Sequence, residues 1–143
     1  MFRRFRRIGI QGYATVRNKL GASEMNQEIN LTKVHDLEWK TLSGGFKYKI
    51  IAQGEKFMTG IGVAPPGSGE TWHKHTDEVE ETYYVLRGEG TMEWKSEGNE
   101  KRIKFTAGDA MYLPFGVENQ FVNTGDAELW LLFNITRAEK LRE

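Results

Sequence analysis

The sequence predicts an all-β fold, a sandwich or barrel, on three observations. From Gly44 onward, apolar and polar residues alternate in short runs, as between Phe46 and Ile50, and this alternation is typical of half-buried strands. Turn signals separate the runs at intervals of about 8–12 residues, which is the spacing of all-β domains. Helical patterns are confined to two short stretches, 31–37 and 137–142.

Each apolar run is a candidate strand that a turn follows. The run that begins at Phe57 alternates as far as Val63, and Pro65-Pro66-Gly67 ends it. Glycine-containing turns are expected at 88–90, 96–99, 107–109 and 124–126. The remaining strands are expected between these breaks, at 71–75, 82–87, 90–95, 101–105, 110–113, 119–123 and 128–135.

Composition narrows the functional classes. A chain of 143 residues is long enough for one domain with its own core. The absence of cysteine excludes disulfides and thiolate metal sites and fits a reducing compartment, so we expect a cytoplasmic protein. No run is long and apolar enough for a membrane span. Phosphate-binding loops and basic patches interleaved with aromatic residues are missing, so neither membrane nor nucleic-acid partners are expected.

The first 24 residues differ from the rest of the chain. They carry six Lys or Arg residues and one acid, Glu24. We interpret 1–24 as a poorly ordered basic extension, with Met25 as a candidate natural start and 25–143 as the single domain. An organelle transit peptide and a basic arm for nucleic acid or an anionic membrane remain alternatives.

Two of the three histidines, His73 and His75, are two residues apart. On a strand such residues point to the same face, with backbones about 6–7 Å apart. Glu81 begins the next strand-like run, and by parity Tyr83 shares its face. Two imidazoles and a carboxylate are suitable ligands for a divalent metal ion such as Fe, Mn, Ni or Zn. The alternative is an incidental pair of histidines on a strand.

The spacing around these histidines resembles the first cupin motif, G-x5-H-x-H-x3,4-E-x6-G. Over 67–88 its positions are Gly67, His73, His75, Glu81 and Gly88. Five residues separate His75 from Glu81 where the motif has three or four. Glu78 and Glu80 are therefore the fallback carboxylates.

The stretch 108–123 resembles the second cupin motif, G-x5-P-x-G-x2-H-x3-N. Gly108, Pro114, Gly116 and Asn123 match, but Asn119 occupies the histidine position. An amide oxygen is a harder and weaker ligand than an imidazole. The resemblance implies that Asn119 either coordinates the metal through this oxygen or bonds to a metal-bound water.

The resemblance also implies a double-stranded β-helix, the cupin jelly-roll barrel, with a metal inside it and a homodimeric assembly; a short C-terminal helix is expected at 137–142. The implied function is that of a metal-dependent enzyme acting on a small oxygenated metabolite, of dioxygenase, isomerase, decarboxylase, lyase or cyclase type. Glu81 and Tyr83 are the catalytic candidates, the latter because a phenol near a metal can orient a substrate oxygen. A non-catalytic small-molecule or sugar-binding cupin with a degenerate metal site is the alternative, and a structural dimer with an empty barrel is a third.

Overall fold

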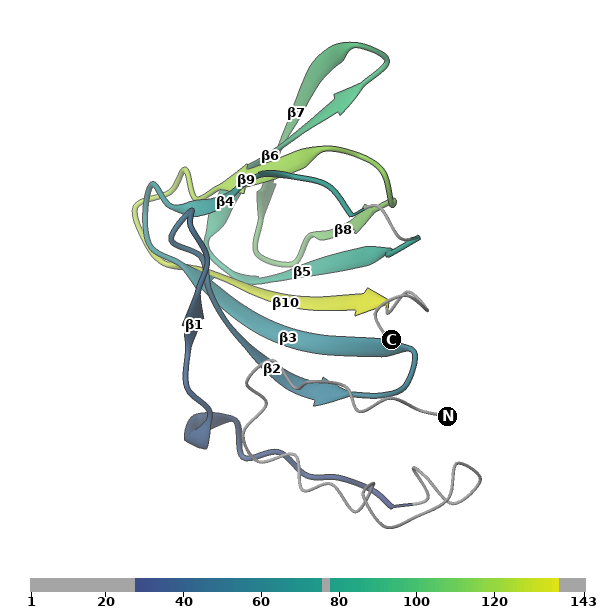
Figure 1. The fold of residues 1–143 in the computed structure, drawn as a ribbon. Helices are drawn as coiled ribbons and strands as arrows, with labels where there is room; N and C mark the ends of the chain where they lie inside the picture. Colours follow the sequence, from purple (N-terminus) through teal and green to yellow (C-terminus); the bar gives the residue numbers. More distant parts are fainter. Residues whose placement is uncertain (1–27, 76–77, 137–143) are drawn as a thin grey trace.

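The computed structural model describes residues 28–75 and 78–136, and within them ten strands form two antiparallel sheets (Figure 1). The larger sheet has the order β1-β2-β3-β10-β5-β8 and the smaller one the order β4-β9-β6-β7. The strands are β1 (Lys40–Thr41), β2 (Lys47–Gln53), β3 (Phe57–Ala64), β4 (Gly69–His73), β5 (Glu81–Arg87), β6 (Glu89–Ser96), β7 (Asn99–Thr106), β8 (Ala110–Leu113), β9 (Asn119–Val122) and β10 (Leu129–Thr136). The all-β prediction is confirmed.

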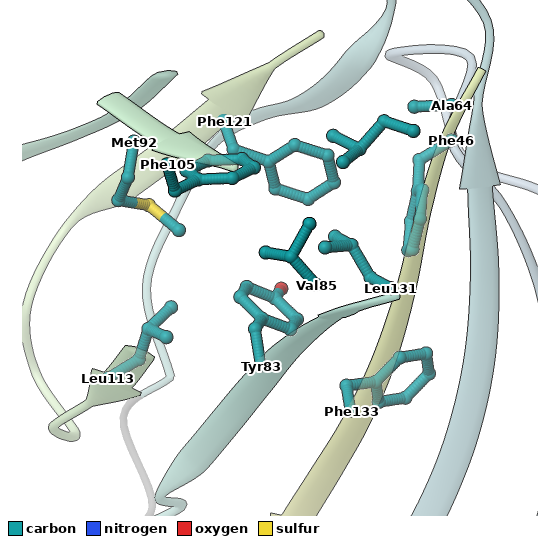
Figure 2. Packing of buried hydrophobic residues seen from close by; sticks show 11 residues of the cluster. Phe46, Ala64, Tyr83, Val85, Met92, Phe105, Leu113, Phe121, Leu131 and Phe133 are labelled. Atoms are coloured by element: carbon teal, nitrogen blue, oxygen red, sulfur yellow. The ribbon is translucent and has the colours of Figure 1, made fainter. Parts of the chain in front are cut away.

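The two sheets pack their alternating apolar faces against each other. Aromatic rings dominate the interior. Phe121 of the smaller sheet packs edge-on against Phe46, the residue before β2, and against Tyr83 of β5, at ring-centroid distances of 5.1 and 5.7 Å. Figure 2 shows these rings converging between the sheets with Val85 and Leu131. This aromatic packing fixes the separation of β5 and β9, the strands that carry three of the predicted site residues, Glu81, Tyr83 and Asn119.

Two sequence expectations about local structure are wrong. Strand β4 ends at His73, so His75 lies in the following loop and not on the same strand. The helix expected at 31–37 is only a 3₁₀ turn, η2 (Val34–Asp36), because Lys33 at its start makes no side-chain cap and so short a helix lacks stability of its own. The basic extension 1–24 and the helix expected at 137–142 lie outside the described residues.

The segment before β2 covers part of the outer face of the larger sheet. There Trp39 packs edge-on against Trp130 with ring centroids 5.8 Å apart, and Lys49 Nζ lies 4.6 Å from the Trp39 ring centroid. In the part of the chain that the structure describes, no helix has the length and apolar character needed to cross a bilayer.

Candidate functional site

Glu81 and His75 form a direct pair at one end of the barrel. Glu81 is the first residue of β5, and it is 5% exposed because its side chain shares the inward face with Tyr83. The His75 Nε2 atom lies 2.9 Å from Glu81 Oε2. The backbone of the loop that carries His75 is held by a hydrogen bond from Gly116 N to His75 O, at 2.7 Å. Hydrogen bonding to Glu81 raises the pKa of His75 above its ordinary value.

His73 is held differently, by its own backbone. Its Nδ1 lies 2.7 Å from the Thr71 carbonyl oxygen, and since a carbonyl only accepts, the neutral ring carries its proton on Nδ1. The lone pair is then on Nε2, which is buried and has no hydrogen-bond partner in the part of the chain that the structure describes. The centroids of the two histidine rings lie 5.4 Å apart, so the structure brings the rings together although the two residues do not share a strand.

Asn119 on β9 lies directly opposite His73 of β4 in the strand register. Its side chain is 4% exposed and belongs to the same buried face as Phe121. The amide nitrogen donates to Val117 O at 3.0 Å, whereas Oδ1 is buried and finds no partner among the residues described. Two acceptor atoms, His73 Nε2 and Asn119 Oδ1, thus lack donors on neighbouring strands, which is rare for buried polar groups.

Glu70 is a site residue that the sequence reasoning missed. Its Oε1 lies 3.6 Å from His73 Nε2, and its Oε2 accepts a hydrogen bond from the Tyr83 hydroxyl at 2.9 Å. Burial raises the pKa of Glu70 above its ordinary value, and the nearby His73 opposes that rise. The strand register shifts between Glu70 and His73, and this irregularity is not readable from residue spacing.

Tyr83 lies between the two carboxylates and is almost fully buried. Burial raises the pKa of Tyr83 well above its ordinary value, and the charges of Glu81 and Glu70 raise it further. The phenol therefore stays protonated near neutral pH and acts as a hydrogen-bond donor. It holds the Glu70 carboxylate in place from the opposite sheet.

The fallback carboxylates and the neighbours of Asn119 are directed elsewhere. Glu80 accepts a hydrogen bond from the Tyr112 hydroxyl on the exposed side of the sheet, and Glu78 is an exposed loop residue with a positive φ of 57°. Glu118 pairs with Lys95 at 2.9 Å. Of the three sequence candidates, Glu81 is thus the carboxylate that pairs with His75.

The donor chemistry of the site fits a divalent metal ion: two imidazoles, two carboxylates and one unpartnered amide oxygen. Among residues 28–75 and 78–136, however, no three His, Asp or Glu side chains come close enough together to hold an ion as they stand. The imidazoles and carboxylates instead form two pairs, Glu70 with His73 and Glu81 with His75.

Comparison with known proteins gives a consistent family. The Cupin domain family model (Cupin_2) matches residues 60–134. The oxalate-binding protein of Thermotoga maritima is 38% identical over 68 residues, which are 48% of this chain and 52% of that protein. An uncharacterized protein of Methanocaldococcus jannaschii is 32% identical over 82 residues, 57% of this chain and 62% of that protein. The chain thus matches less than two thirds of the length of both curated relatives.

Solved structures match over more of their length. KdgF from Halomonas sp. superimposes with a TM-score of 0.64 and 21% identity, covering 80% of this chain and 99% of that one. A predicted oxalate decarboxylase from Thermotoga maritima superimposes with a TM-score of 0.64 and 25% identity, and the match covers 74% of this chain and 97% of that one. The CENP-C cupin domain of Drosophila melanogaster superimposes with a TM-score of 0.64 and 19% identity, and the match covers 77% of this chain and 84% of that one. One fold is thus shared by proteins whose names describe very different roles, so function must be argued from the site.

Proposed function

The chain belongs to the cupin family, and from this premise we propose that its barrel binds a divalent metal ion through His73, His75 and Glu81 and presents it to a small oxygenated metabolite. One observation carries the proposal: His73 Nε2 is buried, has no hydrogen bond to any residue within 28–75 and 78–136, and lies near the Glu70 carboxylate. A lone pair and a carboxylate oxygen 3.6 Å apart are both acceptors. A cation shared between them would satisfy both.

The ligand is expected to be small because a cluster of buried aromatic and aliphatic side chains lies between the two sheets (Figure 2). A bound divalent ion would supply Lewis-acid chemistry to a chelating oxygen ligand. Tyr83, protonated and buried, keeps Glu70 in position by its hydrogen bond. The buried amide oxygen of Asn119 remains able to coordinate the ion or to accept a hydrogen bond from a bound water.

We favour an enzyme of dioxygenase, isomerase, decarboxylase, lyase or cyclase type, in which Glu81 and Tyr83 contact the reacting ligand. The second candidate is a non-catalytic binding protein, and the similarity to a protein named for oxalate binding favours it. Incubation of metal-loaded protein with oxalate and with 2-oxo acids, followed by proton and ¹³C NMR, separates the two. Metal-dependent conversion supports the enzyme, whereas saturable binding without conversion supports the binding protein.

Metal analysis of untagged protein tests the metal proposal itself. After chelator treatment, one equivalent of Mn²⁺, Fe²⁺, Ni²⁺ or Zn²⁺ should bind to the wild type and be lost from His73→Ala and His75→Ala. His35→Ala is the matched control, because His35 is the remaining histidine and its side chain is 80% exposed. Equal binding by the wild type and the His73→Ala variant would count against the site.

Three further features belong to the proposal. Residues 25–143 form one cupin domain that follows a basic extension, which the family match over 60–134 supports. We place the protein in the cytoplasm, because a chain without cysteine fits a reducing compartment, and we expect it to have no nucleic-acid or membrane partner. It assembles as a homodimer, which the exposed apolar side chains on β5 and β8 support.

A further inference from the structure

The register of β4 against β9 places one acidic residue in the barrel that regular alternation would turn outward. Glu70 pairs with Phe121, and His73 pairs with Asn119. Three steps along β4 therefore match two steps along β9, which is the signature of a bulge with one extra residue. Because Phe121 and Asn119 are both buried on the inner face of β9, their partners Glu70 and His73 share that inner face despite their odd spacing.

Only one of the two carboxylate oxygens of Glu70 is engaged by a donor in the described part of the chain. Oε2 accepts the Tyr83 hydroxyl at 2.9 Å. Oε1 faces His73 Nε2 at 3.6 Å, longer than a hydrogen bond, and the ring proton is on the other nitrogen. Two ligands at about 2.1 Å from one tetrahedral ion are about 3.4 Å apart, so this separation suits joint coordination better than hydrogen bonding.

A second and independent observation indicates a cation at this point. Asn119 is 4% exposed and lies directly across the register from His73. Its Oδ1 is buried and has no partner within residues 28–75 and 78–136. Its nitrogen is engaged by Val117 O, which fixes the oxygen in the opposite direction. Among the described residues, these two acceptor atoms of β4 and β9 therefore have no donor, and a positive ion between them would satisfy both.

We propose that Glu70 is a further metal ligand beside His73, His75 and Glu81, and that it compensates for the imidazole that Asn119 replaces. This inference rests on the proposed metal site. It changes the donor set from three nitrogens and one oxygen, as in the complete cupin motifs, to two nitrogens and two carboxylates. Carboxylate ligands suit harder ions, so the site should favour Mn²⁺ more than a three-histidine site does.

Titration of metal alone into chelator-treated, untagged protein tests this assignment. Binding of Mn²⁺ is followed by the electron paramagnetic resonance signal of the free ion, and binding of Zn²⁺ by competition with a chromophoric chelator. Glu70→Ala should raise the Mn²⁺ Kd by at least about 10-fold, and the loss should be smaller for Zn²⁺. Glu80→Gln is the matched control, since its carboxylate bonds to Tyr112 on the exposed side, and it should stay within about twofold of the wild type.

Glu70→Gln keeps the size of the side chain and an oxygen that can accept the Tyr83 hydrogen bond, so it covers the case in which Glu70→Ala fails to fold. Its Co²⁺-loaded form should show an altered visible spectrum, whereas the spectrum of Glu80→Gln should not change. A Mn²⁺ Kd and a Co²⁺ spectrum equal to those of the wild type in Glu70→Gln would overturn the assignment and leave the metal site itself standing. Wild-type protein that binds neither metal would overturn the proposed function as well.

Discussion

His73 and His75 are neighbours in the sequence, but different partners orient their rings. The His73 ring is set by the backbone carbonyl of Thr71, two residues away, and so depends only on the local chain. The His75 ring is set by Glu81, whose position depends on where β5 begins. The hydrogen bond to Thr71 leaves His73 Nε2 available to a ligand, whereas His75 Nε2 is already bonded to the Glu81 carboxylate.

The pairing with Glu81 makes a prediction about the acid–base behaviour of His75. In metal-free protein its pKa should lie above about 6.5, because the hydrogen bond to Glu81 favours the charged ring. A raised folded-state pKa stabilises the fold below about pH 6.5, and this contribution is lost as the pH rises through the folded-state value. Histidine-selective NMR titration measures the shift, and Glu81→Gln should lower the pKa.

The effect of Zn²⁺ on the NMR signal of His75 provides a complementary measurement. If His75 is a ligand, one equivalent of Zn²⁺ should abolish its titration in the accessible range, because coordination requires the neutral ring. A His75 that titrates at or below about 6.5 in the metal-free protein, or that still titrates with zinc bound, contradicts this account.

Asn119 offers a gain-of-function test of the missing ligand. In the variant Asn119→His, an imidazole would lie opposite His73 on β9 and would complete the second cupin motif. We expect the Kd for Ni²⁺ and Zn²⁺, which imidazole ligands suit, to fall by about 10-fold or more. The buried position should cost about 1–3 kcal/mol of stability because a larger ring enters a packed interior. Isothermal titration calorimetry measures the metal Kd, and urea unfolding measures the loss of stability. The control Asn119→Ala should bind these metals no more tightly than the wild type. A folded Asn119→His variant with an unchanged Kd would refute the expectation.

Sequence reasoning located those site residues whose strands alternate regularly. Parity placed Tyr83 on the same face as Glu81, and both side chains are buried, at 2% and 5% exposure. Asn119 also lies on a regular strand, and its neighbours Glu118 and Gln120 bond to other side chains. Glu70 escaped because the bulge in β4 reverses its parity relative to His73. A bulge arises from the pairing of two strands, so one strand's spacing cannot reveal it.

At the scale of elements, the contact between β4 and β9 holds the site together. Gly69 at the start of β4 lies so close to β9 that a Cβ atom there would be 1.9 Å from the Phe121 carbonyl oxygen. A backbone atom cannot move aside as a flexible side chain can. This close approach therefore sets the distance between the strand that carries His73 and the strand that carries Asn119.

Gly69→Ala should accordingly weaken both the fold and the site. We expect a loss of about 3 kcal/mol in the free energy of unfolding, because β4 must move away from β9. The metal Kd should rise in the same variant. Gly98→Ala is the control: its added Cβ meets nothing within 4 Å, and only its φ of +77° should cost about 1 kcal/mol. Urea unfolding with a paired metal titration measures both variants, and equal effects would show that the close approach is unimportant.

Most element positions could be predicted because turn residues and alternation are local signals. The strand expected at 110–113 agrees with β8, and that expected at 82–87 differs from β5 by one residue at its start. The pairing of strands into two sheets was inferred from the motifs of a known family, since β3, β10 and β5 are adjacent although distant in the sequence. Non-local pairing of this kind has no signature in a single short run.

At the scale of the whole molecule, the outer face of the larger sheet is covered unevenly. The chain before β2 protects the part near Trp130, where Trp39 packs. Farther along the same sheet, Tyr84, Leu86 and Tyr112 remain 45%, 44% and 59% exposed. Their strands, β5 and β8, are paired neighbours. Contiguous exposed apolar side chains on a sheet face are typical of an interface.

The homodimer proposal can be tested on this surface. Sedimentation equilibrium of the wild type should give twice the 16.4 kDa mass of one chain. The double variant Tyr84→Glu/Leu86→Glu should be monomeric, because two buried carboxylates facing apolar side chains would be unpaired in the dimer. Ile103→Glu is the matched control: Ile103 is 55% exposed but lies on β7 of the other sheet, and this variant should remain dimeric. If the double variant stays dimeric, or if Ile103→Glu dissociates, the interface does not lie on β5 and β8, and the smaller sheet becomes the candidate. A monomeric wild type would contradict the homodimer proposal.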